Sequence, residues 1–168
     1  MKKTAIIYSF NSLKTRKIAE KIIESFGDFH PEPVNAEEIS GNILLGYDKM
    51  ILGVPTWFDG ELPNYWDEFV PELEDLDLQG REFAIFGLGD QKEYPENFAD
   101  GIGIMAQLLE KQGGKITGYT SGEGYVFEKS RALEGNRFRG LVLDQENQAR
   151  LTGGRVSEWV KTLKEGGF

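Results

Sequence analysis

The sequence contains no cysteine and a single histidine, His30, in 168 residues. Without cysteine the chain cannot form a disulfide, a thiolate nucleophile, an iron–sulfur cluster held by thiolates or a cysteine-ligated zinc site. One histidine offers no pair for a histidine metal site, and beside Pro31 it is expected in an exposed loop. We therefore expect no metal centre in this protein.

Basic residues are also scarce. The 19 lysine and arginine residues are outnumbered by 28 acidic ones, which gives a formal net charge of −9. This balance argues against binding to nucleic acid or to an anionic membrane surface, because both need basic patches. No apolar run approaches the roughly 18 residues of a membrane helix, and the N-terminus lacks the apolar region of a signal peptide. We expect a cytoplasmic protein whose acidity serves solubility alone or also steers it to basic partners.

Short apolar runs alternate with amphipathic segments along the chain, which favours a parallel sheet covered by helices on both faces. Strands are predicted at residues 4–8, 33–35, 49–54, 82–87 and 115–119, a helical turn at 36–40, and helices at 15–26, 64–70, 98–112 and 152–163. An insertion of roughly residues 120–137 interrupts the last strand, which resumes over 138–143. The chain has no internal repeat or linker, so residues 1–168 are expected to form a single domain.

Two of the predicted strands end in loops that place an aromatic residue after glycine or proline. The run 83–86 leads into Gly87-Leu88-Gly89-Asp90-Gln91 and then Tyr94, and the run 50–54 leads into Pro55-Thr56-Trp57. Ligands usually bind at the carboxyl ends of the strands in a doubly wound sheet. Either aromatic residue alone would be read as surface packing, but the pair predicts a slot for a flat ring.

Related motifs follow in the rest of the chain. Gly60-Glu61-Leu62 comes after the first aromatic loop and Asn97-Phe98 after the second. Residues 118–125 open the insertion and residues 143–148 form its exit. Over essentially the whole chain, these segments resemble flavodoxins of the long-chain type, whose fifth strand is split by such an insertion. The resemblance implies a three-layer α/β/α sandwich around a five-stranded parallel sheet of order 2-1-3-4-5.

The resemblance also implies that the protein binds one FMN non-covalently and carries single electrons at low potential, between the semiquinone and the hydroquinone. Trp57 and Tyr94 would sandwich the isoalloxazine, with Asp90 near its pyrimidine ring. The Phe58–Asp59 peptide would turn toward the flavin N5, which would place strain on Asp59. The FMN-binding residues implied for this part of the site are Pro55, Thr56, Trp57, Phe58, Asp59, Gly60, Leu88, Gly89, Asp90, Tyr94, Asn97, Phe98 and Glu146.

Two further implications concern the ribityl chain and the redox partners. Thr56 and Glu146 would face the ribityl chain of FMN. The protein would be an electron carrier and not an enzyme. As a monomer, it would dock transiently on basic-surfaced partners such as a flavodoxin/ferredoxin NADP reductase and an acceptor enzyme.

The loop after the first strand departs from the family pattern. Flavodoxins carry hydroxyl residues at the positions of Phe10, Ser12 and Thr15, of which this chain keeps the last two, and a glycine where Leu13 stands. Backbone N–H groups at the start of the next helix still offer donors to a phosphate, and Lys14 adds charge. We expect FMN to bind in a rearranged or weaker phosphate pocket. A second interpretation, compatible with the first, makes Phe10 a core residue and Ser12 a helix N-cap. The residues expected in this pocket are Ser9, Phe10, Asn11, Ser12, Leu13, Lys14 and Thr15.

Three alternatives compete with an electron carrier. A flavodoxin-like NAD(P)H:quinone reductase needs a nicotinamide surface, and the chain has no evident dinucleotide site. A degenerate flavodoxin that holds FMN weakly is supported by the altered loop alone. A receiver domain shares the strand order, but it needs an acidic pair after the first strand, where Tyr8-Ser9-Phe10 stands.

Overall fold

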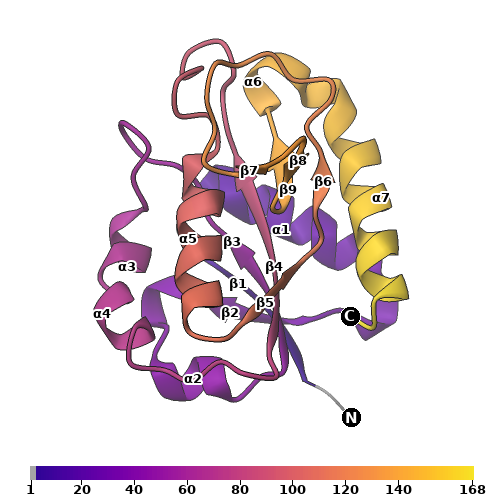
Figure 1. The fold of residues 1–168 in the computed structure, drawn as a ribbon. Helices are drawn as coiled ribbons and strands as arrows, with labels where there is room; N and C mark the ends of the chain where they lie inside the picture. Colours follow the sequence, from indigo (N-terminus) through magenta and orange to yellow (C-terminus); the bar gives the residue numbers. More distant parts are fainter. Residues whose placement is uncertain (1–2) are drawn as a thin grey trace.

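The computed structural model describes residues 3–168, and its middle layer is a parallel sheet of strand order β2-β1-β3-β4-β5 (Figure 1). Neighbouring strands along this path pair in parallel, which confirms the predicted order. Its strands are β1 (Thr4–Tyr8), β2 (Glu32–Asn35), β3 (Lys49–Gly53), β4 (Glu82–Leu88) and β5 (Lys115–Thr117).

The outer strand beside β4 is built in two pieces, as predicted. β5 pairs with residues 82–84, and β9 (Leu141–Leu143) pairs with residues 86–88 further along the same strand. The insertion between them folds into a small antiparallel sheet of β6 (Thr120–Ser121), β7 (Leu133–Glu134) and β8 (Arg137–Phe138), in the order β6-β8-β7. The predicted resumption at Phe138 was wrong by three residues, because Phe138 belongs to the small sheet and the main sheet resumes at Leu141.

Helices cover both faces of the sheet (Figure 1). On one face α1 (Leu13–Phe26) and α7 (Thr152–Glu165) pack on each other. On the other face lie α3 (Asn64–Asp67), α4 (Val70–Leu73) and α5 (Asp100–Lys111), and residues of this face form the larger of two buried apolar clusters. Shorter helices are α2 (Gly41–Leu45), α6 (Gln145–Gln148) and the 3₁₀ turns 27–29, 36–38 and 149–151.

Helix α1 begins two residues before its predicted start and α7 ends two residues after its predicted end, and three other helical regions differ from the prediction more. The single helix expected over 64–70 is two short helices, because Pro71 has no N–H to continue the first and instead stands in the first turn of the second. Helix α5 begins at Asp100 and not at Phe98, since Ala99 before it has a left-handed backbone with φ of 55°. Helix α2 was not predicted, and it begins with Ser40 as a capping residue whose hydroxyl accepts a bond from the Ile43 N–H.

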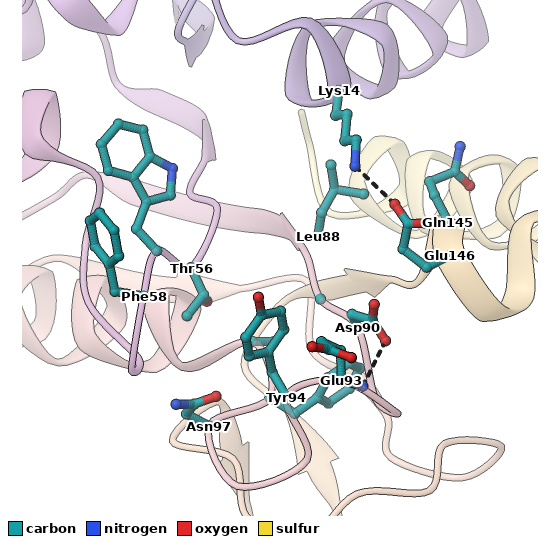
Figure 2. Close-up of a pocket in the computed structure, with 14 residues that line it drawn as sticks. Lys14, Thr56, Phe58, Leu88, Asp90, Glu93, Tyr94, Asn97, Gln145 and Glu146 are labelled. Carbon is teal, nitrogen blue, oxygen red and sulfur yellow. Dashed lines mark hydrogen bonds and ion pairs between the residues drawn. The ribbon is translucent and has the colours of Figure 1, made fainter.

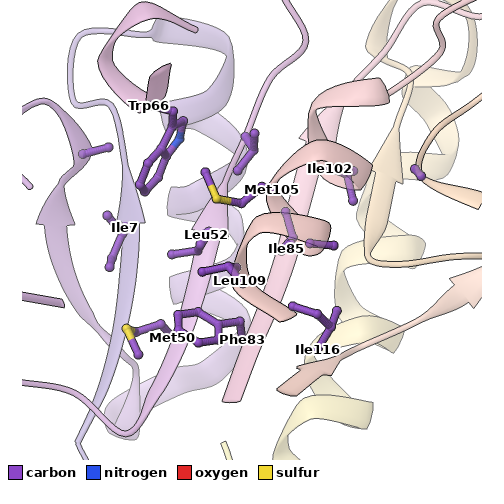
Figure 3. Packing of buried hydrophobic residues seen from close by; sticks show 14 of the residues in the cluster. Ile7, Met50, Leu52, Trp66, Phe83, Ile85, Ile102, Met105, Leu109 and Ile116 are labelled. Atoms are coloured by element: carbon purple, nitrogen blue, oxygen red, sulfur yellow. The ribbon is translucent and has the colours of Figure 1, made fainter. Parts of the chain in front are cut away.

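Both faces of the sheet are buried, which explains why the strand sequences are continuous apolar runs. Successive residues of a buried strand point to opposite faces, so Ile7 and Ile85 face α5 while Ile6 and Ala84 face α1 and α7. Figure 3 shows Ile7, Met50, Leu52, Phe83 and Ile85 of the sheet packed against Ile102, Met105 and Leu109 of α5.

Two tryptophans lie in this core as predicted. Trp66 and Trp159 are 1% and 2% exposed, and their indole N–H groups donate to the carbonyl oxygens of Gly53 and Gly118. The predicted exposure of His30 is also found. Among residues 3–168 no helix is both long enough and apolar enough to cross a bilayer.

Candidate functional site

A cavity of about 550 Å³ opens at the carboxyl ends of β3 and β4, a volume typical of sites for small organic ligands. Its walls come from the first turn of α1, the loop after β3, the loop after β4 and the start of α6 (Figure 2). The lining residues are Lys14, Thr56, Trp57, Phe58, Leu88, Gly89, Asp90, Glu93, Tyr94, Asn97, Phe98, Ala99, Gln145 and Glu146.

The loop after β3 is closed by a pair of backbone hydrogen bonds. The Trp57 N–H donates to the Glu61 carbonyl at 2.8 Å, and the Glu61 N–H donates back to the Trp57 carbonyl at 2.7 Å. Closing so short a loop forces Phe58 to a φ of 48°, while Gly60 takes 90°. The sequence predicted the strain at Asp59; the structure instead places the left-handed residue one position earlier, at Phe58.

The aromatic residues of the two loops reach the same cavity. The Trp57 ring stands edge-on to the rings of Phe58 and Tyr65, at centroid distances of 6.3 and 6.1 Å. Tyr94 comes from the loop after β4 and is 52% exposed. Both rings therefore have surface left for a ligand, which is what the paired strand ends predicted. Their contact with a flavin stays a prediction.

Glycine at position 89 lets the backbone after β4 approach the cavity wall. A Cβ atom added to Gly89 would lie 2.6 Å from the ring of Phe98, so any larger residue would push the two segments apart. Phe98 itself is 1% exposed and stacks on Phe127 of the insertion at 5.0 Å. This predicted site residue therefore supports the cavity from within the core.

Asp90 holds its own loop together. Its Oδ1 accepts hydrogen bonds from the N–H groups of Lys92 at 3.2 Å and Glu93 at 3.0 Å, and from the side-chain amide of Asn147 at 2.8 Å. Asp90 thus has the role of a loop acid that the sequence left open, and it also stands in the cavity wall.

A second acid, Asp144, joins this loop to α6. Asp144 is fully buried. Its carboxylate accepts hydrogen bonds of 2.7–3.1 Å from the backbone N–H and the side-chain amide of both Gln91 and Asn147. The side-chain amide of Asn147 makes a second contact with it at 3.1 Å. Burial alone would raise the pKa of Asp144, but the hydrogen bonds from Asn147 and Gln91 outweigh it and hold the pKa below its usual value. The sequence reasoning missed this residue, although an acid just before a helical segment is a recognisable N-cap signal.

A third acid, Asp100, joins the loop after β3 to the insertion. It is 7% exposed, and its Oδ1 accepts a bond of 2.7 Å from the backbone N–H of Arg131. Its Oδ2 lies 2.7 Å from the position that a Gly60 Cβ would take, so Gly60 packs directly on the carboxylate. Burial raises the pKa of Asp100, and the Arg131 N–H opposes this only in part. Next to it, the Gly101 N–H donates to the Thr56 hydroxyl at 2.9 Å.

Comparison with known proteins decides the family. The sequence model of the flavodoxin family matches residues 6–159 of this chain. The chain belongs to the flavodoxin family. It is 39% identical to a flavodoxin of Klebsiella pneumoniae over 98% of both chains. It is 40% identical to a flavodoxin of Nostoc sp. over 97% of this chain and 96% of the relative.

Solved structures agree with the sequence comparison. The crystal structure of Fusobacterium nucleatum flavodoxin bound to flavin mononucleotide is 30% identical, with a TM-score of 0.92 over 99% of both chains. Oxidised flavodoxin 2 of Bacillus cereus is 28% identical, with a TM-score of 0.74 over 98% of this chain and 99% of that one. The fold is therefore that of a flavodoxin.

The loop after β1, where the sequence departs from the expected family pattern, makes side-chain hydrogen bonds to Glu37 and Asn35, which do not line the cavity. The Ser9 hydroxyl donates to Glu37 Oε1 at 2.8 Å, and the Asn11 side-chain amide donates to Glu37 Oε2 at 2.6 Å. The Phe10 N–H donates to Asn35 Oδ1 at 3.2 Å. Of residues 9–15, all of which the structure describes, Lys14 alone lines the cavity.

The other members of that loop have local roles. Leu13 begins α1, so the missing glycine is not needed for the helix to start there. Ser12 occupies the N-cap position, but its hydroxyl donates to the Thr15 hydroxyl at 3.4 Å and makes no side-chain bond to a helix N–H. Phe10 packs on Tyr8 at 5.0 Å yet is 36% exposed, so it is not a core residue.

The residues that line the cavity differ in part from those predicted from the sequence: some predicted residues are not in the lining, and some lining residues were not predicted. Pro55, Asp59 and Gly60 belong to the loop after β3 but do not line the cavity. Glu93, Ala99 and Gln145 do line it. Each of these stands next to a predicted residue, so a one-residue margin around each motif would have found them.

Proposed function

We propose that this flavodoxin carries single electrons at low potential with FMN held non-covalently in the 550 Å³ cavity. The observation that carries the proposal is that Trp57 and Tyr94, from two separate strand-end loops, line one cavity of the size that a flavin needs. The Fusobacterium nucleatum flavodoxin, whose structure aligns with this one over 99% of the chain, was crystallised with flavin mononucleotide. When bound, FMN supplies the redox chemistry, since no side chain of the protein has to change oxidation state.

The residues of the cavity fit a flavin. Trp57 and Tyr94 offer aromatic faces that stack on a ring and exclude water from it. Gly89 keeps the backbone after β4 close to the cavity, where its polar groups reach the edge of a bound ring. Asp90, Glu93 and Glu146 surround the same space with negative charge, which disfavours the addition of an electron and so lowers the reduction potential.

The proposal includes transient docking on basic redox partners, a reductase that supplies the electron and an enzyme that accepts it. It is supported by the net charge of −9, because an acidic surface raises the rate at which basic partners associate. Phe58, which is 76% exposed at the rim of the cavity, is a contact point for such a partner.

The test is an absorbance spectrum of the purified chain during stepwise anaerobic reduction, with FMN added where needed. We expect flavin bands, a stoichiometry of one FMN per chain, and reduction in two resolved steps. A protein that stays colourless with excess FMN would contradict the proposal. Bleaching by NAD(P)H without any partner protein would favour a quinone reductase instead.

A variant pair ties the flavin to the aromatic slot. Tyr94→Ala should weaken FMN binding by about tenfold, because one stacking face is lost. Phe29→Ala is the control, since Phe29 is an aromatic residue that is 95% exposed and lies outside the cavity lining. Equal FMN affinity of the two variants would count against stacking on Tyr94.

A further inference from the structure

The charged residues that line the cavity are unbalanced. Among the described residues, three carboxylates (Asp90, Glu93 and Glu146) face a single basic side chain, Lys14. The Lys14 Nζ lies 2.8 Å from Glu146 Oε1, so this one cation is already paired with an acid. Figure 2 shows the pair at the end of the cavity opposite Phe58, with Lys14 extending from α1 toward Glu146 of α6.

The ion pair between Lys14 and Glu146 is free to exchange partners and contributes little to the stability of the fold. The side chains of Lys14 and Glu146 are 73% and 52% exposed, and ion pairs this exposed contribute little to folding. The hydrogen bond and charge of Glu146, and to a smaller extent the charge of Asp90, raise the pKa of Lys14. Lys14 therefore stays charged, and a phosphate that approaches its ammonium also meets the negative charge of Glu146, which already holds one of the three N–H donors.

Two other side-chain donors near the start of α1 are committed elsewhere. Ser9 and Asn11 donate to the two carboxylate oxygens of Glu37, which is not among the residues that line the cavity. A phosphate arriving at the start of α1 therefore meets Lys14 as its cationic partner in the cavity lining, beside backbone N–H groups and the Ser12 hydroxyl, whose bond to Thr15 is long at 3.4 Å. Competition between the phosphate and Glu146 for the Lys14 ammonium then determines how much the phosphate contributes to the free energy of flavin binding.

We propose that Glu146 is an internal competitor for Lys14, and that this pair sets how strongly the site prefers a phosphate-bearing flavin over one without phosphate. The inference rests on the proposed function, because it presupposes that the cavity binds a flavin. Glu146 acts here through Lys14, as a residue that determines specificity, and not by touching the flavin ring.

The experiment compares FMN with riboflavin, which lacks only the phosphate. Dissociation constants for both are measured by fluorescence quenching on the full chain after removal of bound flavin. Glu146→Gln should tighten FMN binding by up to about fivefold, the range of an exposed ion pair, and leave riboflavin unchanged. Lys14→Gln should weaken FMN by about tenfold, because a charged hydrogen bond to phosphate is lost, and also leave riboflavin unchanged.

Two further variants isolate the competition. In the double variant Lys14→Gln/Glu146→Gln, FMN should bind as in Lys14→Gln alone, because without the lysine there is nothing to compete for. Glu20→Gln is the matched control, since it removes the acid of another exposed ion pair of α1, with Arg16 at 3.3 Å, and Glu20 does not line the cavity. It should leave the ratio of the FMN and riboflavin affinities within about twofold of the original.

Several outcomes would overturn the inference. If Glu146→Gln weakened FMN and riboflavin alike, Glu146 would act on the part that the two flavins share. If Glu20→Gln tightened FMN as much as Glu146→Gln, the effect would come from the general charge of the protein and not from competition for Lys14. If the unmodified chain bound neither flavin, the proposed function itself would fail and the inference with it. Binding of both flavins with no response to Glu146→Gln would refute the inference alone.

Discussion

On one side of the cavity the fully buried Asp144 accepts hydrogen bonds from Gln91 and Asn147, whereas on the other the exposed Glu37 accepts them from Ser9 and Asn11. The buried network fixes the loop that presents Tyr94. The network around Glu37 holds a loop of which Lys14 alone, among residues 9–15, lines the cavity. The aromatic side depends on specific side chains, while the α1 side can rely on backbone N–H groups that any sequence provides. The α1 side, where this chain departs from the pattern expected of the family, is therefore the side that depends less on the identity of its side chains.

The largest effect is expected from breaking the buried side. Asp144→Ala should lower the free energy of unfolding by about 3–4 kcal/mol, because it leaves several buried donors of Gln91 and Asn147 without an acceptor. It should also weaken FMN binding, since the loop carrying Tyr94 loses its attachment to α6. Urea unfolding of the flavin-free chain and an FMN titration measure the two effects. A loss below 1 kcal/mol would mean that this network does not hold the loop.

The features that sequence could predict are those with a repeating pattern. Apolar runs of strand length alternating with amphipathic segments predicted the sheet, and the resemblance supplied the strand order and the split outer strand. Glycine and proline at two strand ends predicted that Trp57 and Tyr94 would meet at one cavity. These signals are local, and parallel topology then brings the strand ends together.

Contacts without a pattern could not be predicted. Nothing in the sequence near Glu37 indicates that it binds Ser9 and Asn11, because the contact depends on how β1 and β2 are paired in the sheet. The left-handed backbone at Phe58 is another case. Aspartate tolerates that conformation better than phenylalanine, so residue type pointed to Asp59, and the two bonds between Trp57 and Glu61 place it at Phe58 instead.

The two buried acids should respond to pH in opposite directions. The folded pKa of Asp144 is lowered, so its contribution to stability is present above the unfolded pKa and lost as the pH falls through the folded value. The folded pKa of Asp100 is raised, so its contribution is present below the ordinary value of 3.8 and lost as the pH rises through the folded value.

Asp100→Asn tests this because asparagine keeps an oxygen for the Arg131 N–H but cannot ionise. Its unfolding free energy, relative to the original chain, should rise as the pH increases from about 3.8 through the folded pKa of Asp100. Urea unfolding at a series of pH values gives this difference. If this difference in unfolding free energy did not change with pH, burial of the ionised Asp100 carboxylate would cost no stability. Burial would then destabilise the loop after β3 no more than the α1 side.

A smaller effect is expected at the rim. Phe58→Gly should raise the free energy of unfolding by up to about 1 kcal/mol, because glycine accepts a φ of 48° without strain and the lost side chain is 76% exposed. Asp59→Gly is the matched control, since its φ is not positive, and it should lower stability by roughly 0.5–1 kcal/mol. Thermal unfolding of both variants separates the two positions, and the reverse order would place the strain at Asp59 after all.

The smallest effect is expected from Glu37→Ala on the α1 side. The carboxylate is exposed, and water can replace it as the acceptor for Asn11, so the free energy of unfolding should fall by about 1 kcal/mol or less. Most of this loss comes from Ser9, which is 1% exposed and whose hydroxyl loses its acceptor, although its oxygen still accepts the bond from the Asn11 N–H. Measured beside Asp144→Ala under the same conditions, this variant decides the comparison. If removing Glu37 cost as much as removing Asp144, the α1 side would be as dependent on its side chains as the aromatic side. Its departures from the family pattern would then have to be explained by compensation through Glu37 and not by tolerance of the backbone.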